Sequence, residues 1–329
     1  MWYITVGQDK LMTGWVLFFL ISCVLIVVAG KLVIEALIRV SRFLGWKEFV
    51  VAFFTVSLGA TLPEFFIGIT SALKGIPQLS LGNIFGENII LFSLAPGLSV
   101  LILKSLEMES RTVRAGSTFA VLAAILPLLL IWDGELSRID GVILILCFPL
   151  YIFWLFSKKE RFSKIYEQEE RQPIIKSFFS FLKDIAIIFG GLFLIVLFAQ
   201  GIISSAEVFS EALKISLPLV GILIVSLGTA LPETYLSINL ARAGQSWMIL
   251  GGLMGSVAIS STLVLGSVAI IRPIVVPDLF SFAIARLFLI ISALFFLFFL
   301  KTDNKITLKE ALFLFGIYIA FLMVEILIK

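Results

Sequence analysis

The sequence predicts an all-α integral membrane protein with ten transmembrane helices arranged as two inverted five-helix repeats. Three observations support this fold class. Hydrophobic residues make up 60% of the 329 residues and charged residues 14%, whereas a soluble domain carries about 25% charged residues. The mean hydropathy is +1.13, and long apolar runs recur along the chain. One apolar phrase that contains proline and glutamate occurs twice.

A helix needs about 20 apolar residues to cross the hydrocarbon core of a bilayer. Apolar windows bounded by charged, Gly or Pro residues give five candidates in the first half of the chain. In order they are 12–36 (followed by Arg39), 47–73 (bounded by Lys47 and Lys74), 78–103 (bounded by Pro77 and Lys104), 115–132 (bounded by Arg114 and Asp133) and 139–157 (bounded by Arg138 and Lys158).

The second half gives five more candidates by the same rule. They are 178–203 (preceded by Lys176), 215–240 (bounded by Lys214 and Arg242), 247–271 (followed by Arg272), 278–300 (bounded by Pro277 and Lys301) and 307–328 (preceded by Lys305). Loop 157–176 is the longest polar segment and separates the two sets of five spans.

The two halves contain the same motif at a constant spacing of 169 residues. "VSLGATLPE" at 56–64 and "VSLGTALPE" at 225–233 agree at seven of nine positions. The register then continues without a gap through Gly82 and Gly251, and through Gly86 and Gly255. The copies fall in spans 2 and 7, so an odd number of crossings separates them and they run through the membrane in opposite senses. Gly/Pro-interrupted helices in inverted repeats indicate the midplane site of a secondary transporter.

Loop charges predict the orientation of the chain. Loops on one side carry 17 Lys and Arg residues and loops on the other carry 6, with Lys31 and Arg286 inside spans. Because positively charged loops stay cytoplasmic, we expect a multi-pass protein of the cell (plasma or inner) membrane with both termini outside. The predicted organisation is a first repeat at 1–157 with motif region 56–97, a cytoplasmic linker at 158–177, and a second repeat at 178–329 with motif region 225–266.

The motif suggests an oxygen-lined cation site. Proline removes a backbone hydrogen bond and clashes with the carbonyl four residues back, so we expect free carbonyls around 59–61 and 228–230. Such carbonyls need protein, water or an ion as a partner in the membrane. Glu64 and Glu233 follow the two prolines directly, although a buried acid costs about 3 kcal/mol on insertion scales. Carboxylates and carbonyls supplied from both directions suit Ca²⁺, which takes about six to eight oxygen ligands.

Further polar residues lie near the two motifs. Thr61 and Thr229 stand beside the prolines and add hydroxyl oxygens. The next span of each repeat contributes a second set, namely Glu87 and Asn88 in the first repeat and Ser256 and Ser260 in the second. The pairs Gly82/Gly86 and Gly251/Gly255 predict close helix packing in both copies. Packing does not explain Glu87, which is a third acid within the membrane.

These residues resemble the Ca²⁺/cation antiporter superfamily, whose sodium/calcium exchangers carry two inverted repeats of the form G-T-S-x-P-E followed by G-N-x-x-G-S-N. The resemblance implies that Glu64 and Glu233 are the central carboxylates and that Thr229 and Ser256 are ligands. Ala60 stands at the threonine position of the first copy, so only its backbone carbonyl carries over. Thr61 stands where the family has serine.

The chain also departs from the family pattern. Glu87 stands where members usually have serine, and Leu91 and Ser260 stand where exchangers show Asn in the first repeat and Asp or Asn in the second. The third acid has thus moved from the second repeat to the first. For this reason the coordination and number of sodium ions do not carry over from the family.

The resulting hypothesis is a secondary active antiporter that exchanges Ca²⁺ for Na⁺ by alternating access, with spans 1 and 6 sliding across the bundle. The residues leave open a Ca²⁺/H⁺ antiporter, an exchanger of another cation, and a cation channel lined by the same acids. We expect neither an enzyme nor a cofactor, because His is absent and neither cysteine is near the glutamates. The expected partners are inorganic cations and the lipid bilayer, without nucleic acid, and we expect a monomer.

Overall fold

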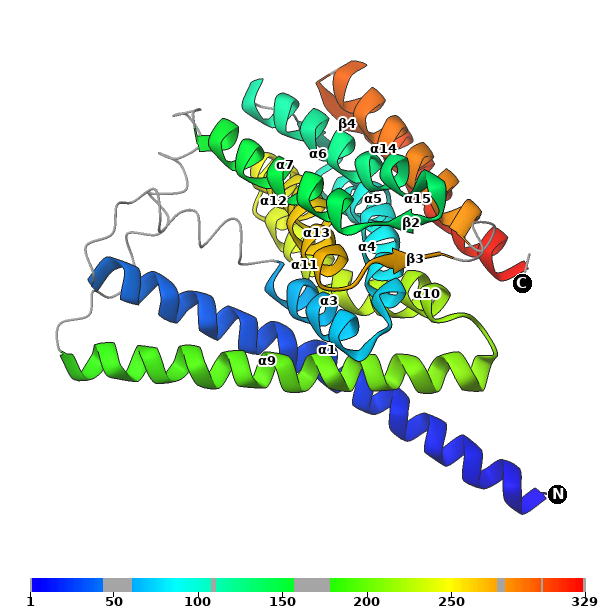
Figure 1. Cartoon of the computed structure of the whole chain (residues 1–329). Coiled ribbons are helices and arrows are strands. Elements are labelled where there is room, and N and C mark those ends of the chain that lie inside the picture. The colour runs from blue at the N-terminus through cyan, green and yellow to red at the C-terminus, as the bar shows by residue number, and fades with distance from the viewer. Residues whose placement is uncertain are drawn as a thin grey trace.

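The computed structural model describes residues 2–43, 61–107, 111–156, 178–276, 282–302 and 304–327. These residues form a helical bundle in two layers (Figure 1). One layer is a pair of long helices, α1 (Trp2–Phe43) and α9 (Phe178–Leu213), which pack against each other and cross one side of the molecule. The remaining helices form the second layer.

The second layer draws its helices from both halves of the chain. The first half contributes α3 (Leu62–Lys74), α4 (Pro77–Phe92), α5 (Leu94–Leu103), α6 (Arg111–Leu130), the 3-10 turn η2 (Ile131–Asp133) and α7 (Arg138–Phe156). The second half contributes α10 (Leu217–Val220), the π-helical turn η3 (Gly221–Val225), α11 (Ser226–Arg242), α12 (Ser246–Ile259), the π-helical turn η4 (Ser260–Val264), α13 (Leu265–Ile271), α14 (Ala283–Thr302) and α15 (Leu308–Leu327).

The prediction of a helical membrane protein is confirmed. Within the described residues, 8 helical stretches are long and apolar enough to span a membrane, and each overlaps a predicted span. They are Met12–Leu37, Pro77–Leu103, Ala115–Asp133, Ser180–Leu213, Leu217–Arg242, Met248–Ile271, Ala283–Thr302 and Leu308–Leu327. Of the other two predicted spans, 139–157 corresponds to α7, and only the α3 part of 47–73 is described. Ten spans therefore remain a prediction.

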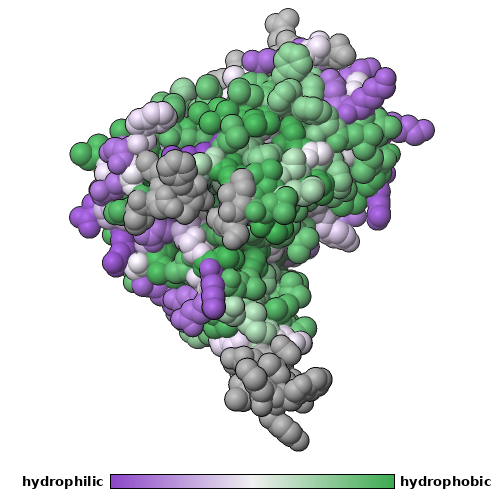
Figure 2. All heavy atoms as spheres, turned by 90° about the vertical axis from the view of Figure 1, so that its right-hand side faces the viewer, coloured by the Kyte–Doolittle hydropathy of each residue, from purple (hydrophilic) through white to green (hydrophobic). Residues whose placement is uncertain are grey.

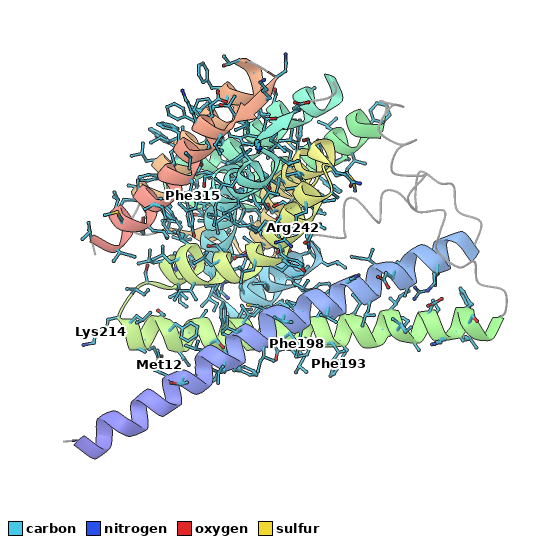
Figure 3. The ribbon with its side chains drawn as sticks, turned by 180° about the vertical axis from the view of Figure 1, so that it is seen from behind. Met12, Phe193, Phe198, Lys214, Arg242 and Phe315 are labelled. Carbon is cyan, nitrogen blue, oxygen red and sulfur yellow. The ribbon has the colours of Figure 1, made fainter. Side chains whose placement is uncertain are left out.

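The surface agrees with a lipid environment. Figure 2 shows hydrophobic residues over much of one face, with hydrophilic residues gathered in separate patches. On α9, Phe193 points away from the bundle and is 69% exposed (Figure 3). Large apolar side chains of α7 are exposed as well, with Phe153 at 78%. Such exposure is costly in water, whereas lipid tails accept these side chains.

Two short strand pairs were not predicted by the all-α reading. β1 (Ser105–Glu107) pairs antiparallel with β4 (Lys305–Thr307), and β2 (Glu135–Leu136) pairs antiparallel with β3 (Ile274–Val275). Each pair joins loops from opposite halves of the chain, and β1 and β3 begin 169 residues apart. Loop backbone at helix ends needs hydrogen-bond partners, and these ladders supply some of them.

The helices that follow β2 and β4 begin with the same capping arrangement. At the start of α7, the Asp140 carboxylate accepts hydrogen bonds from the Ser137 N–H at 2.9 Å and from its hydroxyl at 2.7 Å. At the start of α15, Glu310 accepts the equivalent bonds from Thr307, both at 2.7 Å. In each case an acid three residues further along the chain accepts hydrogen bonds from the N–H and the hydroxyl of the residue directly before the helix. This is the arrangement of a capping box. The same local structure thus occurs at matching places in the two halves.

The predicted helix interruption differs between the two motif copies. α3 starts at Leu62, so Pro63 stands in its first turn, where the missing N–H costs nothing. The Phe65 N–H donates to the Thr61 carbonyl at 2.9 Å, so that carbonyl is not free as predicted. α11 continues through Pro232 without a break, and the irregular turn is η3, which ends directly before α11. The proline leaves the Gly228 carbonyl without its usual helical donor, but it does not end the helix.

The predicted close packing is present around the first copy of the glycine motif. A Cβ built on Gly82 would lie 2.1 Å from the Pro218 carbonyl oxygen, and one on Gly86 would lie 2.2 Å from that of Ile222. α4 therefore packs directly on the backbone of α10 and η3. For Gly255 the prediction was wrong within the described residues, because a Cβ there would meet no heavy atom within 4 Å.

Candidate cation site

The predicted site residues that the structure describes lie on or directly before four helices and on one π-helical turn. Glu64 is in the first turn of α3, Glu87 and Asn88 are on α4, and Thr229 and Glu233 are on α11. Ser256 is on α12 and Ser260 begins η4. α4 packs against both α3 and α11, and α11 packs against α12. The fold thus brings the polar residues of both motif regions toward α4.

Nearly all of these side chains are buried. The exposed fractions are 2% for Glu64 and Thr61, 0% for Glu87 and Ser260, 1% for Asn88, 5% for Thr229 and 3% for Ser256. Glu233 is partly buried. Thr61 lies directly before α3, and Ala60 falls outside the described residues. Burial of so many polar groups requires internal partners or a ligand.

Glu233 is held by the next helix of its own repeat. The Ser256 hydroxyl on α12 donates a hydrogen bond to Oε1 of Glu233 on α11. The second oxygen, Oε2, is buried and accepts no hydrogen bond. A carboxylate with one oxygen fixed by a hydroxyl and the other free is oriented to bind a cation.

A hydrogen bond across the two halves positions Thr229. Its hydroxyl on α11 donates to Oδ1 of Asn83 on α4 at 3.0 Å. Because the proton points at Asn83, the hydroxyl lone pairs remain available to a cation. Asn83 was missed by the sequence analysis, although it is the asparagine of the "LGNIFG" stretch, which matches the G-N of the family motif.

Asn88 connects α4 to η4. Its amide nitrogen donates to the Ser261 hydroxyl at 2.8 Å, and the Ser260 hydroxyl approaches its Oδ1 at 3.5 Å. Ser261 is fully buried and was also missed, since nothing in its local sequence distinguishes it from a packing serine. The two candidate ligands Asn88 and Ser260 thus lie close together, in a network that also includes Ser261.

Three carboxylates lie in this region without a described counter-charge, although within the described residues no group of three or more His, Cys, Asp or Glu side chains is arranged to hold a metal ion. Glu64 and Glu233 lie within electrostatic range of each other, and Glu87 lies within range of both. Oε2 of Glu64 and both oxygens of Glu87 are buried and accept no hydrogen bond. The ion pairs in the described part of the chain involve other residues. Buried carboxylates without partners are strongly unfavourable, so this arrangement favours a cation.

The long helix α1 covers the motif helices through small residues. Gly30 lies against the Pro63 ring, where a Cβ would come within 3.8 Å of it. A Cβ on Gly228 would lie 2.7 Å from Sγ of Cys23. α1 thus contacts both copies of the motif, and the ring of Phe19 also lies against Gly228.

We expect Ser256→Ala to lower the apparent Ca²⁺ affinity about 10-fold. The hydroxyl donates to a carboxylate, and such bonds contribute about 1.5–3 kcal/mol. Calorimetric titration of the purified protein with Ca²⁺ measures the change, and Ser256→Thr, which retains a hydroxyl, serves as the matched variant. Equal affinities for wild type and the alanine variant would show that this bond does not orient Glu233 for binding.

Comparisons with known proteins are consistent with this geometry. The sequence profile of a family described as "Sodium/calcium exchanger protein" matches residues 14–157 and 183–327. The inner membrane protein YrbG of Escherichia coli is 25% identical over 264 residues, which cover 77% of this chain and 79% of that protein. The sodium/calcium exchanger MaX1 of Methanosarcina acetivorans is 25% identical over 345 residues, covering 94% and 97%. The crystal structure of the H⁺/Ca²⁺ exchanger CAX is similar to this chain with a TM-score of 0.72 and 20% sequence identity. The match covers 94% of this chain and 82% of that one and shows a similar fold.

Proposed function

The chain belongs to the sodium/calcium exchanger protein family, and on this basis we propose that it is a secondary active antiporter exchanging Ca²⁺ for Na⁺ by alternating access. The observation that carries the proposal is a set of three neighbouring carboxylates on α3, α4 and α11, each with at least one buried oxygen that accepts no hydrogen bond. Ca²⁺ is a hard cation that binds carboxylate, hydroxyl and carbonyl oxygens. The three glutamates supply carboxylate oxygens, and Thr229 and Ser256 bring hydroxyl oxygens to the same helices.

In this proposal Glu64 and Glu233 hold the ion from opposite halves of the chain. Thr229 and Ser256 add a hydroxyl and an orienting hydrogen bond. The other proposed ligands are Glu87, Asn88, Thr61, Ser260 and the backbone carbonyl of Ala60. When Ca²⁺ leaves, the carboxylates need replacement charge, because an empty anionic site inside the membrane is costly. Competition between Ca²⁺ and the coupling ion for the same carboxylates then produces exchange.

Matching local structures support the proposed inverted repeats. The strand pairs β1/β4 and β2/β3 and the two capping boxes occupy corresponding places in the two halves. With the proposed ten spans, these places fall on opposite sides of the membrane. The proposed topology has both termini outside and the 157–176 loop in the cytoplasm.

Glu87 supports a second candidate, coupling to H⁺. A third carboxylate at the centre can accept a proton when Ca²⁺ leaves, which a serine at this position cannot do. The relative MaX1 is named a sodium/calcium exchanger, and the structurally similar CAX is an H⁺/Ca²⁺ exchanger, so the family likeness alone does not decide the ion.

Flux in proteoliposomes tests the function and the coupling ion together. We expect ⁴⁵Ca²⁺ uptake when Na⁺ is loaded inside, and at least about 10-fold less when choline replaces Na⁺. Uptake driven by an inward-acidic pH gradient without Na⁺ would favour H⁺ coupling. Uptake that follows the Ca²⁺ gradient alone would indicate a channel, and absence of uptake under every gradient would contradict the antiporter.

A further inference from the structure

Lys74 lies at the end of the helix that carries Glu64. It is in the last turn of α3, and its ammonium group reaches across to α9. Nζ donates a hydrogen bond to the Ser204 hydroxyl at 3.1 Å and lies 3.9 Å from Oε2 of Glu207. Elsewhere the contact between α3 and the α1–α9 pair includes the buried apolar side chains Leu62 and Ile67. Lys74 therefore adds polar contacts at one end of an interface that includes apolar side chains.

The turn that follows Lys74 is also held to the rest of the bundle. The Gln78 amide donates to the Val275 carbonyl at 3.0 Å. A Cβ built on Gly75, which has a φ of +87°, would lie 3.0 Å from a guanidinium nitrogen of Arg272. The α3–α4 turn thus contacts α9 on one side and the α13–β3 segment on the other. These contacts hold the last turn of α3, the helix that carries Glu64, and the turn after it against their neighbours.

The matching turn in the other half lacks these contacts. With the 169-residue offset, Lys74 corresponds to Ala243 and Gly75 to Gly244. Gly244 has a φ of +72°, so the same turn is built, but a Cβ there would meet no described heavy atom within 4 Å. Glu207 on α9 corresponds to Ile38 on α1. The equivalent contact between α11 and α1 would therefore have neither partner of the ion pair. Among the residues that the structure describes, the contact is therefore one-sided although the surrounding turn is duplicated.

We propose that Lys74 is a positioning residue that closes one side of the site, by tying the Glu64 helix α3 to the α1–α9 pair through Ser204 and Glu207. With the proposed topology this is the outer side. The proposal rests on the proposed function, in which the α1–α9 pair moves relative to the other helices, α3 included. A contact present at one end only favours the state in which that end is closed, and thereby sets the resting balance between the two access states.

The contact has the strength expected of a reversible closure. The side chains of Lys74 and Glu207 are 32% and 43% exposed, and pairs of this kind contribute about 0.2–1 kcal/mol. A change of that size alters a two-state ratio by up to about fivefold. That is enough to bias access and too little to prevent turnover.

The first test removes the charge and measures exchange from each side separately. We expect Lys74→Met to lower the half-saturating Ca²⁺ concentration on the outer side about two- to fivefold and to raise it on the inner side. A purely structural loss would not move the two values in opposite directions. Lys214→Met removes another positive charge at the end of α9 (Figure 3) and should change neither value. The pair Lys74→Glu with Glu207→Lys should restore the wild-type values that Lys74→Glu alone disturbs.

The second test prevents the two helices from separating. Lys74→Cys and Glu207→Cys are combined in a chain whose Cys23 and Cys147 are replaced by alanine, and a short bifunctional thiosulfonate reagent joins them. Exchange should stop and return on reduction, while equilibrium Ca²⁺ binding in detergent persists. Full exchange by the cross-linked protein would overturn the proposal. If the unlinked protein neither binds nor exchanges Ca²⁺ and wild type behaves likewise, the proposed function itself fails.

Discussion

Replacing Glu64 or Glu233 by glutamine is expected to abolish Ca²⁺ exchange, lowering the initial rate in proteoliposomes by at least about 100-fold. Each glutamate comes from a different copy of the motif, and each has an oxygen that is buried and accepts no hydrogen bond. Glutamine keeps the size of the side chain and one oxygen but removes the charge. The affinity of calcium sites depends steeply on the number of charged ligands, so either loss should be severe.

The control for this experiment is Glu211→Gln. Glu211 lies on α9 and is exposed, whereas the carboxylates of the site have buried oxygens. Its substitution should leave Ca²⁺ uptake within about twofold of wild type. Elution of each variant as a single peak in size-exclusion chromatography separates loss of binding from loss of folding. Normal exchange by Glu64→Gln or Glu233→Gln would remove that residue from the mechanism.

The sequence was sufficient to single out the acidic residues on which the proposed site depends. A duplicated proline–glutamate phrase in an apolar chain marks Glu64 and Glu233, because random apolar sequence does not place two acids in matching spans. The position of Glu87 inside the membrane-spanning part of the chain was likewise predictable from the sequence, and Glu87 is fully buried. In each case the physical cause is the cost of a polar group in the membrane, which is visible in the sequence itself.

Other features depended on tertiary packing and could not be predicted. Asn83 and Ser261 entered the network through partners about 146 and 173 positions away in the chain. Pro232 was expected to interrupt its helix, yet α11 continues through it. Gly86 and Gly255 occupy the same repeat position, but only Gly86 contacts a described neighbour. A repeat predicts equivalent positions and does not predict equivalent surroundings.

Gly82→Ala is expected to destabilise the folded protein, by about 3 kcal/mol or more, which corresponds to a fall of about 5–10 °C in the thermal midpoint. The added Cβ would lie 2.1 Å from the Pro218 oxygen and 3.0 Å from the carbonyl carbon of the same residue. These are backbone atoms, so no side chain can rotate to make room. α4 would have to move away from α10 and η3, and α4 also carries Glu87 and Asn88.

Gly190→Ala is the matched control, because Gly190 is an exposed helical glycine of α9 whose Cβ would meet nothing within 4 Å. There alanine should raise the midpoint slightly, since it is the better helix former by about 1 kcal/mol. Gly221→Ala tests the same contact from the other side, where a Cβ would lie 2.6 Å from the Leu79 oxygen. A thermal-shift series in detergent compares the three variants. If Gly82→Ala and Gly221→Ala both melt like Gly190→Ala, α4 is not packed on the α10–η3 backbone, and the hydrogen bond from Thr229 to Asn83 loses its structural support.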